Sequence, residues 1–249
     1  MKTLTILVDM DDTIVELLPV WVKHLNLAHN FNILPDEITD WKIGRFFPSI
    51  SQEQVFFPLY NDDFWKEVKP KLGAVEYLRQ LIDDGHTIYI VTSSFCDTLS
   101  QKMKYAIYPH FPYLSWDNII VTSNKQMIRG DILVDDGVHN HDGGAHFGIL
   151  MDTPHNRYFD NEAQGIIRVQ AWPEVYYIIN NIAGQWKTSR TYIMEGNGMV
   201  KREISEAITE TAEDCCSGDY FLGSNECFSS SFDDFTLSYM HSKTSSFWQ

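Results

Sequence analysis

The sequence predicts an α/β fold built on an open parallel sheet, and three observations support this. Short, apolar, β-rich runs recur along the chain. Helical patterns separate several of these runs, as the crossovers of a parallel sheet require. Hydrophobic residues make up 44% of the 249 residues and aromatic residues 14%, which is enough apolar surface for a sizeable core. The predicted strands lie at 3–8, 87–91, 118–121, 132–134 and 148–151.

The first quarter of the chain predicts one strand, one helix and an aromatic-rich insertion. Residues 3–8 form an apolar run that stops at a group of aspartates, as a buried parallel strand does. Apolar residues then recur at helical spacing between Leu18 and Leu25, which predicts an amphipathic helix over 16–30. Residues 31–68 show no regular period and are rich in aromatic residues. The sheet therefore starts at residue 3 and is interrupted before its second strand.

The remaining strands follow a second helix. Residues 74–82 predict this helix, and Gly85 is typical of its end. Four strand-like runs come after it, and the polar residues that are candidates for a functional site stand where these runs end. In open parallel sheets, ligands bind beyond the carboxyl ends of the strands. We therefore expect a binding site at that edge of the sheet.

Carboxylates, hydroxyls and one ammonium follow four of the predicted strands. In chain order they are Asp9, Asp11, Thr92, Ser93, Lys125, Asp135 and Asp136. Adjacent carboxylates repel one another unless a cation neutralises them. An oxygen-rich ligand set beside a lysine indicates Mg²⁺ and a phosphate rather than Zn²⁺. The expected metal ligands are Asp9, Asp11, Asp135 and Asp136.

These residues predict a phosphoryl-transfer reaction. Asp9 can attack phosphorus and form an aspartyl-phosphate intermediate. Asp11, two residues on, can protonate the leaving alcohol and then activate water. Thr92, Ser93 and Lys125 are expected to bind the phosphoryl oxygens and to balance their charge.

The same residues resemble the four motifs of the haloacid dehalogenase superfamily of phosphatases. Asp9-Met10-Asp11-Asp12-Thr13 is similar to the first motif, and Thr92, Lys125 and the Asp135-Asp136 pair match the other three in order. The first motif alone is only moderately specific, but four motifs in order at strand ends are a strong signal. The resemblance implies a Rossmann-like core and a phosphatase activity.

A closer resemblance is to the 5′(3′)-deoxyribonucleotidase family of the cytosolic type C. The similar stretches are 36–41, 64–68, 125–136, 149–157 and 172–175. The resemblance covers about residues 3–183. It implies a small helical cap inserted between the first two motifs and Mg²⁺-dependent removal of phosphate from deoxynucleoside monophosphates. The implied domains are a core of residues 1–14 and 69–184, a cap of 15–68 and an extension of 185–249.

The cap and the first motif depart from the family pattern in ways that leave base preference open. Leu17 stands where animal members carry a base-contacting aromatic residue, and Asp12 and Thr13 stand where those members have small residues. Phe64 and Trp65 are the cap residues expected to stack on a base or sugar. The alternative is that both rings only pack the cap against the core.

Charge and cysteine usage restrict the partners. The formal net charge is −15, from 34 acidic and 19 basic residues, so neither a nucleic-acid polymer nor an anionic membrane is an expected partner. The first apolar run is too short for an export signal or a spanning helix. The four cysteines form no zinc or disulfide pattern. We expect a cytoplasmic enzyme for a small phosphomonoester; a symmetric homodimer is common at this size.

Two other functions stay open. The chain could be a phosphatase of the same superfamily for another phosphomonoester, such as a sugar phosphate. It could also be a binding protein with a vestigial site that recruits a protein partner through residues 185–249, an acidic, serine-rich stretch with scattered aromatic residues. Within that stretch, 201–216 has helical spacing. The complete catalytic set argues against the binding protein.

Overall fold

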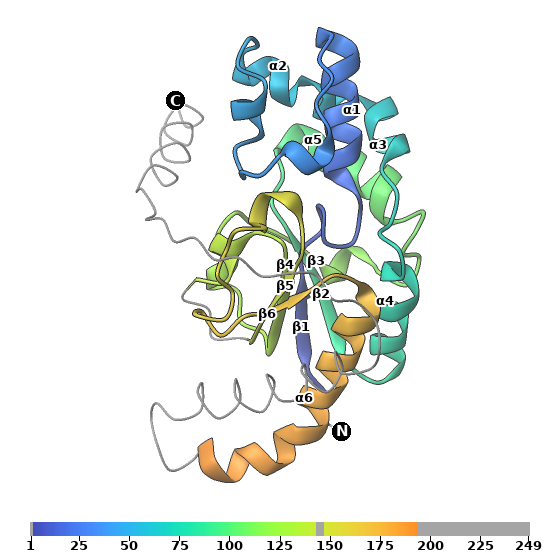
Figure 1. Cartoon of the computed structure of the whole chain (residues 1–249). Helices are drawn as coiled ribbons and strands as arrows, with labels where there is room; N and C mark the ends of the chain where they lie inside the picture. Colours follow the sequence, from blue (N-terminus) through green and yellow to red (C-terminus); the bar gives the residue numbers. More distant parts are fainter. Residues whose placement is uncertain (1, 143–146, 194–249) are drawn as a thin grey trace, which may run out of the picture. The chain divides into compact units, whose positions relative to one another are not determined.

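The computed structural model describes residues 2–142 and 147–193. Its centre is a six-stranded, entirely parallel sheet in the order β3-β2-β1-β4-β5-β6 (Figure 1). The strands are β1 (Thr5–Val8), β2 (Thr87–Thr92), β3 (Ile119–Val121), β4 (Ile132–Asp135), β5 (Phe147–Met151) and β6 (Ile167–Val169). The α/β class and the parallel sheet expected from the sequence are confirmed. β6 is a strand that the sequence pattern did not reveal.

Six α-helices accompany the sheet in the described residues. They are α1 (Leu17–His29), α2 (Gln52–Phe56), α3 (Asp62–Glu67), α4 (Ala74–Asp83), α5 (Cys96–Gln101) and α6 (Trp172–Ile193). The helices expected at 16–30 and 74–82 correspond to α1 and α4. Helix α1 ends where Asn30 adopts a left-handed conformation (φ 57°), a common way for a helix to stop.

Short helical turns connect these elements. Seven are 3₁₀ turns: η1 (Pro35–Glu37), η2 (Ile43–Phe46), η3 (Phe57–Tyr60), η5 (Trp116–Asn118), η6 (Lys125–Met127), η7 (Val138–Asn140) and η8 (Pro154–Asn156). The eighth, η4 (Lys102–Ile107), is a π-helical continuation of α5. Such π-helical segments are rare and are often found at functional sites.

The central strand β1 divides its side chains between two apolar layers. Ile6 and Val8 belong to the main core, to which α4 and α6 contribute Leu78 and Ile179. Leu7 points to the other face, where it packs with residues of β2 and β4. Because side chains alternate along a strand, a strand buried on both faces must be apolar throughout. This explains why Ile6, Leu7 and Val8, directly before the aspartates, are all apolar.

The insertion between β1 and α4 has an apolar core of its own. It is built from α1, α2 and the turns around them, and Figure 1 shows these helices at one end of the sheet. Its buried residues are Leu18, Val22, Leu25, Ile38, Ile43, Phe47 and Val55. Helix α3 belongs instead to the main core through Phe64 and Trp65. The insertion predicted as a helical cap is thus a set of short helices with a distinct centre.

The C-terminal segment is only partly described. Helix α6 runs from Trp172 past the expected core boundary at 184 to Ile193. The remainder of the predicted extension, including the helix expected over 201–216, lies outside the described residues. No helix among the described residues is both long enough and apolar enough to span a lipid bilayer.

Candidate active site

Three carboxylates meet at the carboxyl ends of the neighbouring strands β1 and β4. Asp9 directly follows β1, and its backbone N–H donates to the carbonyl oxygen of Val134 in β4 (2.8 Å). Asp135 is the last residue of β4, and Asp136 follows it. One carboxylate oxygen from each lies within 4.8 Å of the other two, and all three residues are buried. The parallel pairing of β1 with β4 is what brings these distant parts of the chain together.

The lysine expected beside these carboxylates contacts two of them. The Lys125 side chain, at the start of η6, is only 5% exposed. Its ammonium donates to Asp9 Oδ1 (2.5 Å) and Asp135 Oδ2 (2.6 Å). Burial would by itself lower the pKa of Lys125, but the charges of Asp135 and Asp9 outweigh burial and raise it. Lys125 therefore carries a positive charge inside the site.

One ammonium cannot neutralise three buried carboxylates, and their pKa values reflect this. Burial raises the pKa of Asp9 well above its ordinary value despite the opposing charge of Lys125. Burial and the charge of Asp135 raise the pKa of Asp136 to about 7. Burial acts in the same direction on Asp135, but Lys125 and other partners outweigh burial and lower its pKa. A further positive charge would relieve this imbalance.

The three-carboxylate group fits a hard divalent cation such as Mg²⁺. All of its donors are oxygens, the ligands that Mg²⁺ prefers. Asp136 Oδ1 is buried and has no hydrogen-bond partner among the described residues, and a buried polar atom in that state indicates an absent ligand. The fourth predicted metal ligand, Asp11, is not part of this group.

Residues that the sequence did not indicate orient these carboxylates. Asp135 Oδ1 accepts hydrogen bonds from the backbone N–H of Gly137 (2.8 Å) and from Asn140 Nδ2 (2.9 Å). His155 Nε2 lies 2.9 Å from Asp136 Oδ2, and burial lowers the pKa of His155. Such supporting contacts fix the geometry of a metal site. Asn140 lies in no recognised sequence pattern, and His155, although it lies in the similar stretch 149–157, has no predicted role, so their contacts are visible only in the fold.

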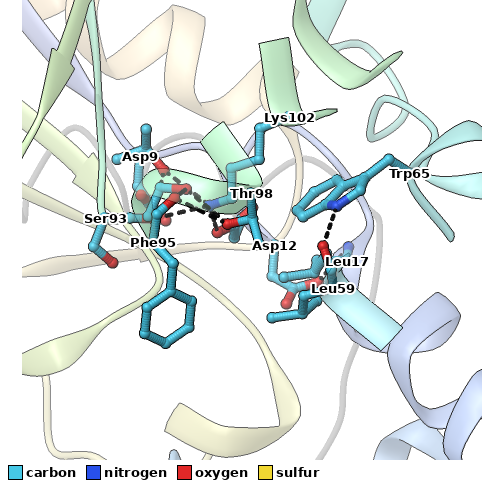
Figure 2. A network of polar contacts seen from close by, with 12 residues as sticks. Asp9, Asp12, Leu17, Leu59, Trp65, Ser93, Phe95, Thr98 and Lys102 are labelled. Carbon is cyan, nitrogen blue, oxygen red and sulfur yellow. Dashed lines mark hydrogen bonds and ion pairs between the residues drawn. The ribbon is translucent and has the colours of Figure 1, made fainter. Parts of the chain in front are cut away.

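Asp11, Thr92 and Ser93 surround a different lysine. Lys102 donates to Asp11 Oδ2 (2.5 Å), to the Ser93 carbonyl oxygen (2.9 Å) and to Thr92 Oγ1 (3.3 Å). Figure 2 shows Lys102 reaching toward Ser93 from one side of this network. Thr92 is fully buried, and Ser93 is exposed. The structure thus brings the predicted acid–base residue and two of the three predicted phosphate-binding residues together around a lysine that the sequence did not predict.

The two departures in the first motif have structural roles. Asp12 adopts a left-handed conformation (φ 54°), and its carboxylate accepts hydrogen bonds from the backbone N–H groups of Leu17 and Leu18 (3.0 and 2.9 Å). Burial and the charge of Asp136 raise the pKa of Asp12 to about 7. The Thr13 carbonyl oxygen accepts a hydrogen bond from the Trp172 indole (3.0 Å). Asp12 therefore caps α1, where an acidic side chain is favourable.

The two cap aromatics expected to stack on substrate are fully buried. Phe64 and Trp65 each have 0% exposure, and their rings pack edge to face with centroids 5.2 Å apart. The Trp65 indole donates to the Leu59 carbonyl oxygen (2.8 Å). Neither ring presents a free face in this arrangement, because each is enclosed by the main core. The geometry favours the alternative, in which both rings pack the cap against the core.

A second aromatic pair is exposed instead. Tyr60 in η3 and Phe95, three residues after Thr92, are 46% and 51% exposed. Their rings are nearly parallel, at 19°, with centroids 6.4 Å apart. Tyr60 comes from the insertion and Phe95 from the segment that follows β2. This exposed aromatic pair, Tyr60 and Phe95, offers flat apolar surface, and its member Phe95 follows Ser93 by two residues (Figure 2).

Comparison with known proteins identifies the family. Residues 2–185 match the family model described as 5′ nucleotidase, deoxy (Pyrimidine), cytosolic type C protein. The chain belongs to this family. The resemblance to the 5′(3′)-deoxyribonucleotidase family, recognised from the similar stretches, is therefore confirmed, and the family match spans the sheet, the insertion and every residue of the candidate site.

Relatives and solved structures agree with the family assignment. The 5′(3′)-deoxyribonucleotidase of Bacillus subtilis (strain 168) is 29% identical over 172 residues, which are 68% of this chain and 95% of that protein. The 5′(3′)-deoxyribonucleotidase of Clostridium acetobutylicum is 28% identical over 170 residues, covering 68% and 91% of the two chains. The fold is similar to that of a haloacid dehalogenase-like protein of Agrobacterium tumefaciens (TM-score 0.51, 13% identity, 73% of this chain and 100% of that chain).

Proposed function

We propose that the protein is a Mg²⁺-dependent 5′(3′)-deoxyribonucleotidase that hydrolyses deoxynucleoside monophosphates through an aspartyl phosphate on Asp9. The observation that carries the proposal is the position of Asp9: buried at the end of β1, ion-paired with Lys125 and grouped with two further carboxylates. Family membership and the names of the relatives support the same substrate class.

In the first chemical step, a carboxylate oxygen of Asp9 forms a bond to phosphorus. The bond from phosphorus to the leaving oxygen breaks, and its electron pair stays on that oxygen. Asp11 gives the leaving oxygen a proton, so that a neutral nucleoside departs. Lys125 is close enough to Asp9 to balance the negative charge that the carboxylate and phosphoryl group share.

In the second step, water forms a bond to phosphorus and gives its proton to Asp11. The bond between phosphorus and the Asp9 oxygen breaks, and its electron pair returns to the Asp9 carboxylate. Inorganic phosphate is the product, and both aspartates end as they began. General acid–base help of this kind contributes about 10²- to 10⁴-fold to a rate.

We assign the metal to Asp9, Asp135 and Asp136, and Asp11 enters only as the acid and base. When bound, Mg²⁺ would neutralise this group and withdraw charge from the phosphoryl oxygens. Burial raises the pKa of Asp9 and Lys125 opposes that effect, so a bound cation would further favour the ionised, nucleophilic carboxylate. The supporting contacts of Gly137 and Asn140 keep Asp135 in place.

We further propose that the exposed aromatic pair, Tyr60 and Phe95, contacts the nucleobase. The pair lies beyond the phosphate-binding end of β2 and, unlike Phe64 and Trp65, has exposed ring surface. Base–aromatic stacking contributes about 1–3 kcal/mol per base. The proposed setting is the cytoplasm, where reduced cysteines such as the free Cys96 are usual, and a symmetric dimer is common for enzymes of this size.

The test is phosphate release from a panel of deoxy- and ribonucleoside 5′- and 3′-monophosphates and sugar phosphates. We expect metal-dependent turnover that favours deoxynucleotides and stops when chelator removes the metal. Asp9→Asn should lower kcat by at least about 10³-fold, because it removes the nucleophile. Acid quenching with radiolabelled substrate should trap phosphorylated protein in the wild type and none in the variant.

The control is the melting temperature of Asp9→Asn, which should show a folded protein. A variant that turns over within tenfold of the wild type would contradict the covalent mechanism. Turnover of sugar phosphates alone would retain the Asp9 chemistry and replace the substrate class. Absence of turnover with every substrate would support the vestigial-site alternative.

A further inference from the structure

Lys102 is a buried lysine whose hydrogen bonds are all used inside the protein. It opens the π-helical turn η4, and its side chain is only 5% exposed. A buried ammonium is costly unless it is fully paired. The three N–H bonds of Lys102 have three acceptors: a carboxylate of the first motif, a backbone carbonyl and a hydroxyl at the end of β2. Because all three N–H bonds already have acceptors, Lys102 has no donor left for a phosphate oxygen.

The position of this ammonium is restricted from the cap side as well. Lys102 Nζ lies 5.7 Å from the centroid of the Trp65 ring, within the range of a cation–π contact. Trp65 is itself fixed, since its indole donates to the Leu59 carbonyl oxygen and its ring is fully buried (Figure 2). Lys102 is thus held between the end of β2 and helix α3.

The contact with Lys102 makes the two oxygens of Asp11 unequal. Oδ2 is bound to the ammonium. Oδ1 is buried and has no hydrogen-bond partner among the described residues. A carboxyl group fixed at one oxygen cannot rotate freely about its last bond, so the other oxygen keeps one position. Oδ1 is then the atom available for proton transfer.

The two buried lysines at this end of the sheet therefore have separate partners. Lys125 contacts Asp9 and Asp135, and Lys102 contacts Asp11. One lysine therefore partly neutralises the three-carboxylate group, and a different lysine contacts Asp11, the residue that is proposed to transfer protons.

We propose that Lys102 is the positioning residue for Asp11. By binding Oδ2 it fixes the carboxyl group relative to the Thr92–Ser93 segment and leaves Oδ1 for the leaving oxygen and, later, for water. The proposal rests on the proposed function, because it concerns the acid–base step of that reaction. A displacement of about 1 Å of a catalytic group can cost about 10²-fold in rate.

The test compares leaving groups in Lys102→Met, a variant of similar length that cannot bind Oδ2. A deoxynucleoside leaves as an alcohol and needs the proton from Asp11, whereas p-nitrophenolate leaves p-nitrophenyl phosphate without one. Because kcat/KM reports the steps up to departure of the leaving group, we expect it to fall about 10²-fold with a deoxynucleoside monophosphate. With p-nitrophenyl phosphate it should fall by no more than about threefold, since that step does not use the proton.

Two matched variants complete the experiment. Lys104→Met changes an exposed lysine of the same turn, 66% exposed and 4.0 Å from Asp62, and should leave both substrates within about twofold of the wild type. Lys102→Arg keeps the positive charge and several donors, and should restore part of the lost nucleotide activity. Melting temperatures identify any variant that has lost its fold. If Lys102→Met does not fold, Lys102→Arg replaces it in the test. Lys102→Arg is then expected to show a smaller loss that is again selective for the deoxynucleotide over p-nitrophenyl phosphate.

An equal loss with both substrates in a folded variant would overturn the assignment and give Lys102 a purely structural role at the end of β2. Unchanged nucleotide turnover would also overturn it. A wild type that hydrolyses neither substrate would overturn the proposed function and this assignment together. A wild type that is active, but whose variants lack the selective loss, would overturn the assignment alone.

Discussion

At the scale of single residues, the small number of positive charges beside the buried carboxylates determines the electrostatics of the site. Lys125 neutralises part of the group formed by Asp9, Asp135 and Asp136, and burial raises the pKa values of Asp9 and Asp136. Such shifts are typical of functional sites. The imbalance explains why a cation belongs to the proposed mechanism, because a cation would favour the ionised forms of these carboxylates.

The exposed aromatic pair gives a prediction at the same scale. Phe95→Leu should raise KM for deoxynucleotides by roughly 5- to 150-fold, because stacking on a base is worth about 1–3 kcal/mol. Deoxyribose 5-phosphate has no base, so its KM should not change. Steady-state kinetics with both substrates measures the difference.

Phe57→Leu is the matched control, since Phe57 is an exposed phenylalanine at the start of η3. It should leave both KM values unchanged. If Phe95→Leu raises KM equally for the nucleotide and the sugar phosphate, Phe95 supports the phosphate site rather than the base.

At the scale of elements, the segment after β1 is fixed at several points. The Asp12 carboxylate caps α1, and the Trp172 indole at the start of α6 binds the Thr13 carbonyl oxygen. The other end of the sheet has a comparable contact: the backbone N–H of Leu4, just before β1, donates to Nδ1 of His86, just before β2 (3.2 Å). The neutral imidazole of His86 therefore accepts a hydrogen bond that links the starts of β1 and β2.

This contact predicts a stability change with pH. Burial lowers the pKa of His86 below its ordinary value of 6.5, so the unfolded chain binds the proton more readily than the folded one. The contribution of His86 to stability is complete above about pH 6.5 and is lost as the pH falls below that value, by at most about 1.4 kcal/mol per pH unit. Urea unfolding at pH 7.5 and 5.5 measures the loss.

His86→Gln provides the comparison, because glutamine keeps an acceptor and cannot be protonated. The free energy of unfolding of this variant should fall less between the two pH values than that of the wild type. Burial also lowers the pKa values of His139, His141 and His155, so the variant should still lose some stability. Identical pH dependence in the two proteins would exclude a contribution from His86.

At the scale of the whole molecule, the proposed chemistry lies within the family match. Every residue assigned a role in the site stands between Asp9 and His155, and the match extends over 2–185. Helix α6 continues to Ile193. The acidic, serine-rich remainder contributes no residue to the proposed mechanism and belongs to the segment that the alternative function assigns to a protein partner.

Removing residues 194–249 should therefore leave kcat and KM within about twofold of the full chain, since no proposed catalytic or binding residue is lost. The measurement is turnover of a deoxynucleoside monophosphate by the chain ending at Ile193. Full-length protein, prepared in parallel, is the reference. A loss of tenfold or more in a folded truncation would give the C-terminal segment a part in catalysis.

The sequence predicts the sheet and the strand-end aspartates well, because both follow from local patterns. Apolar runs locate five strands, and parallel strands present their carboxyl ends at one edge. It misses β6, which has three residues and includes the polar Arg168. The sequence does not predict a role for Lys102, because nothing in the local sequence distinguishes it from Lys104. Packing of the chain buries Lys102 and leaves Lys104 exposed. The burial of Phe64 and Trp65 is hidden for the same reason.

The order of the strands has a consequence for how the chain reaches its native state. β1 is the first strand to be synthesised, yet its partners come much later: Thr5 pairs with Thr87 in β2, and Ile6 with Ile132 in β4. Closing such long loops costs chain entropy before any strand pairing repays it, and folds dominated by distant contacts form slowly. During synthesis, the apolar segment that leads to Asp9 lacks one of its two partner strands until β4 has left the ribosome. This topology therefore favours aggregation of the incomplete chain before β4 is available, rather than instability of the folded protein.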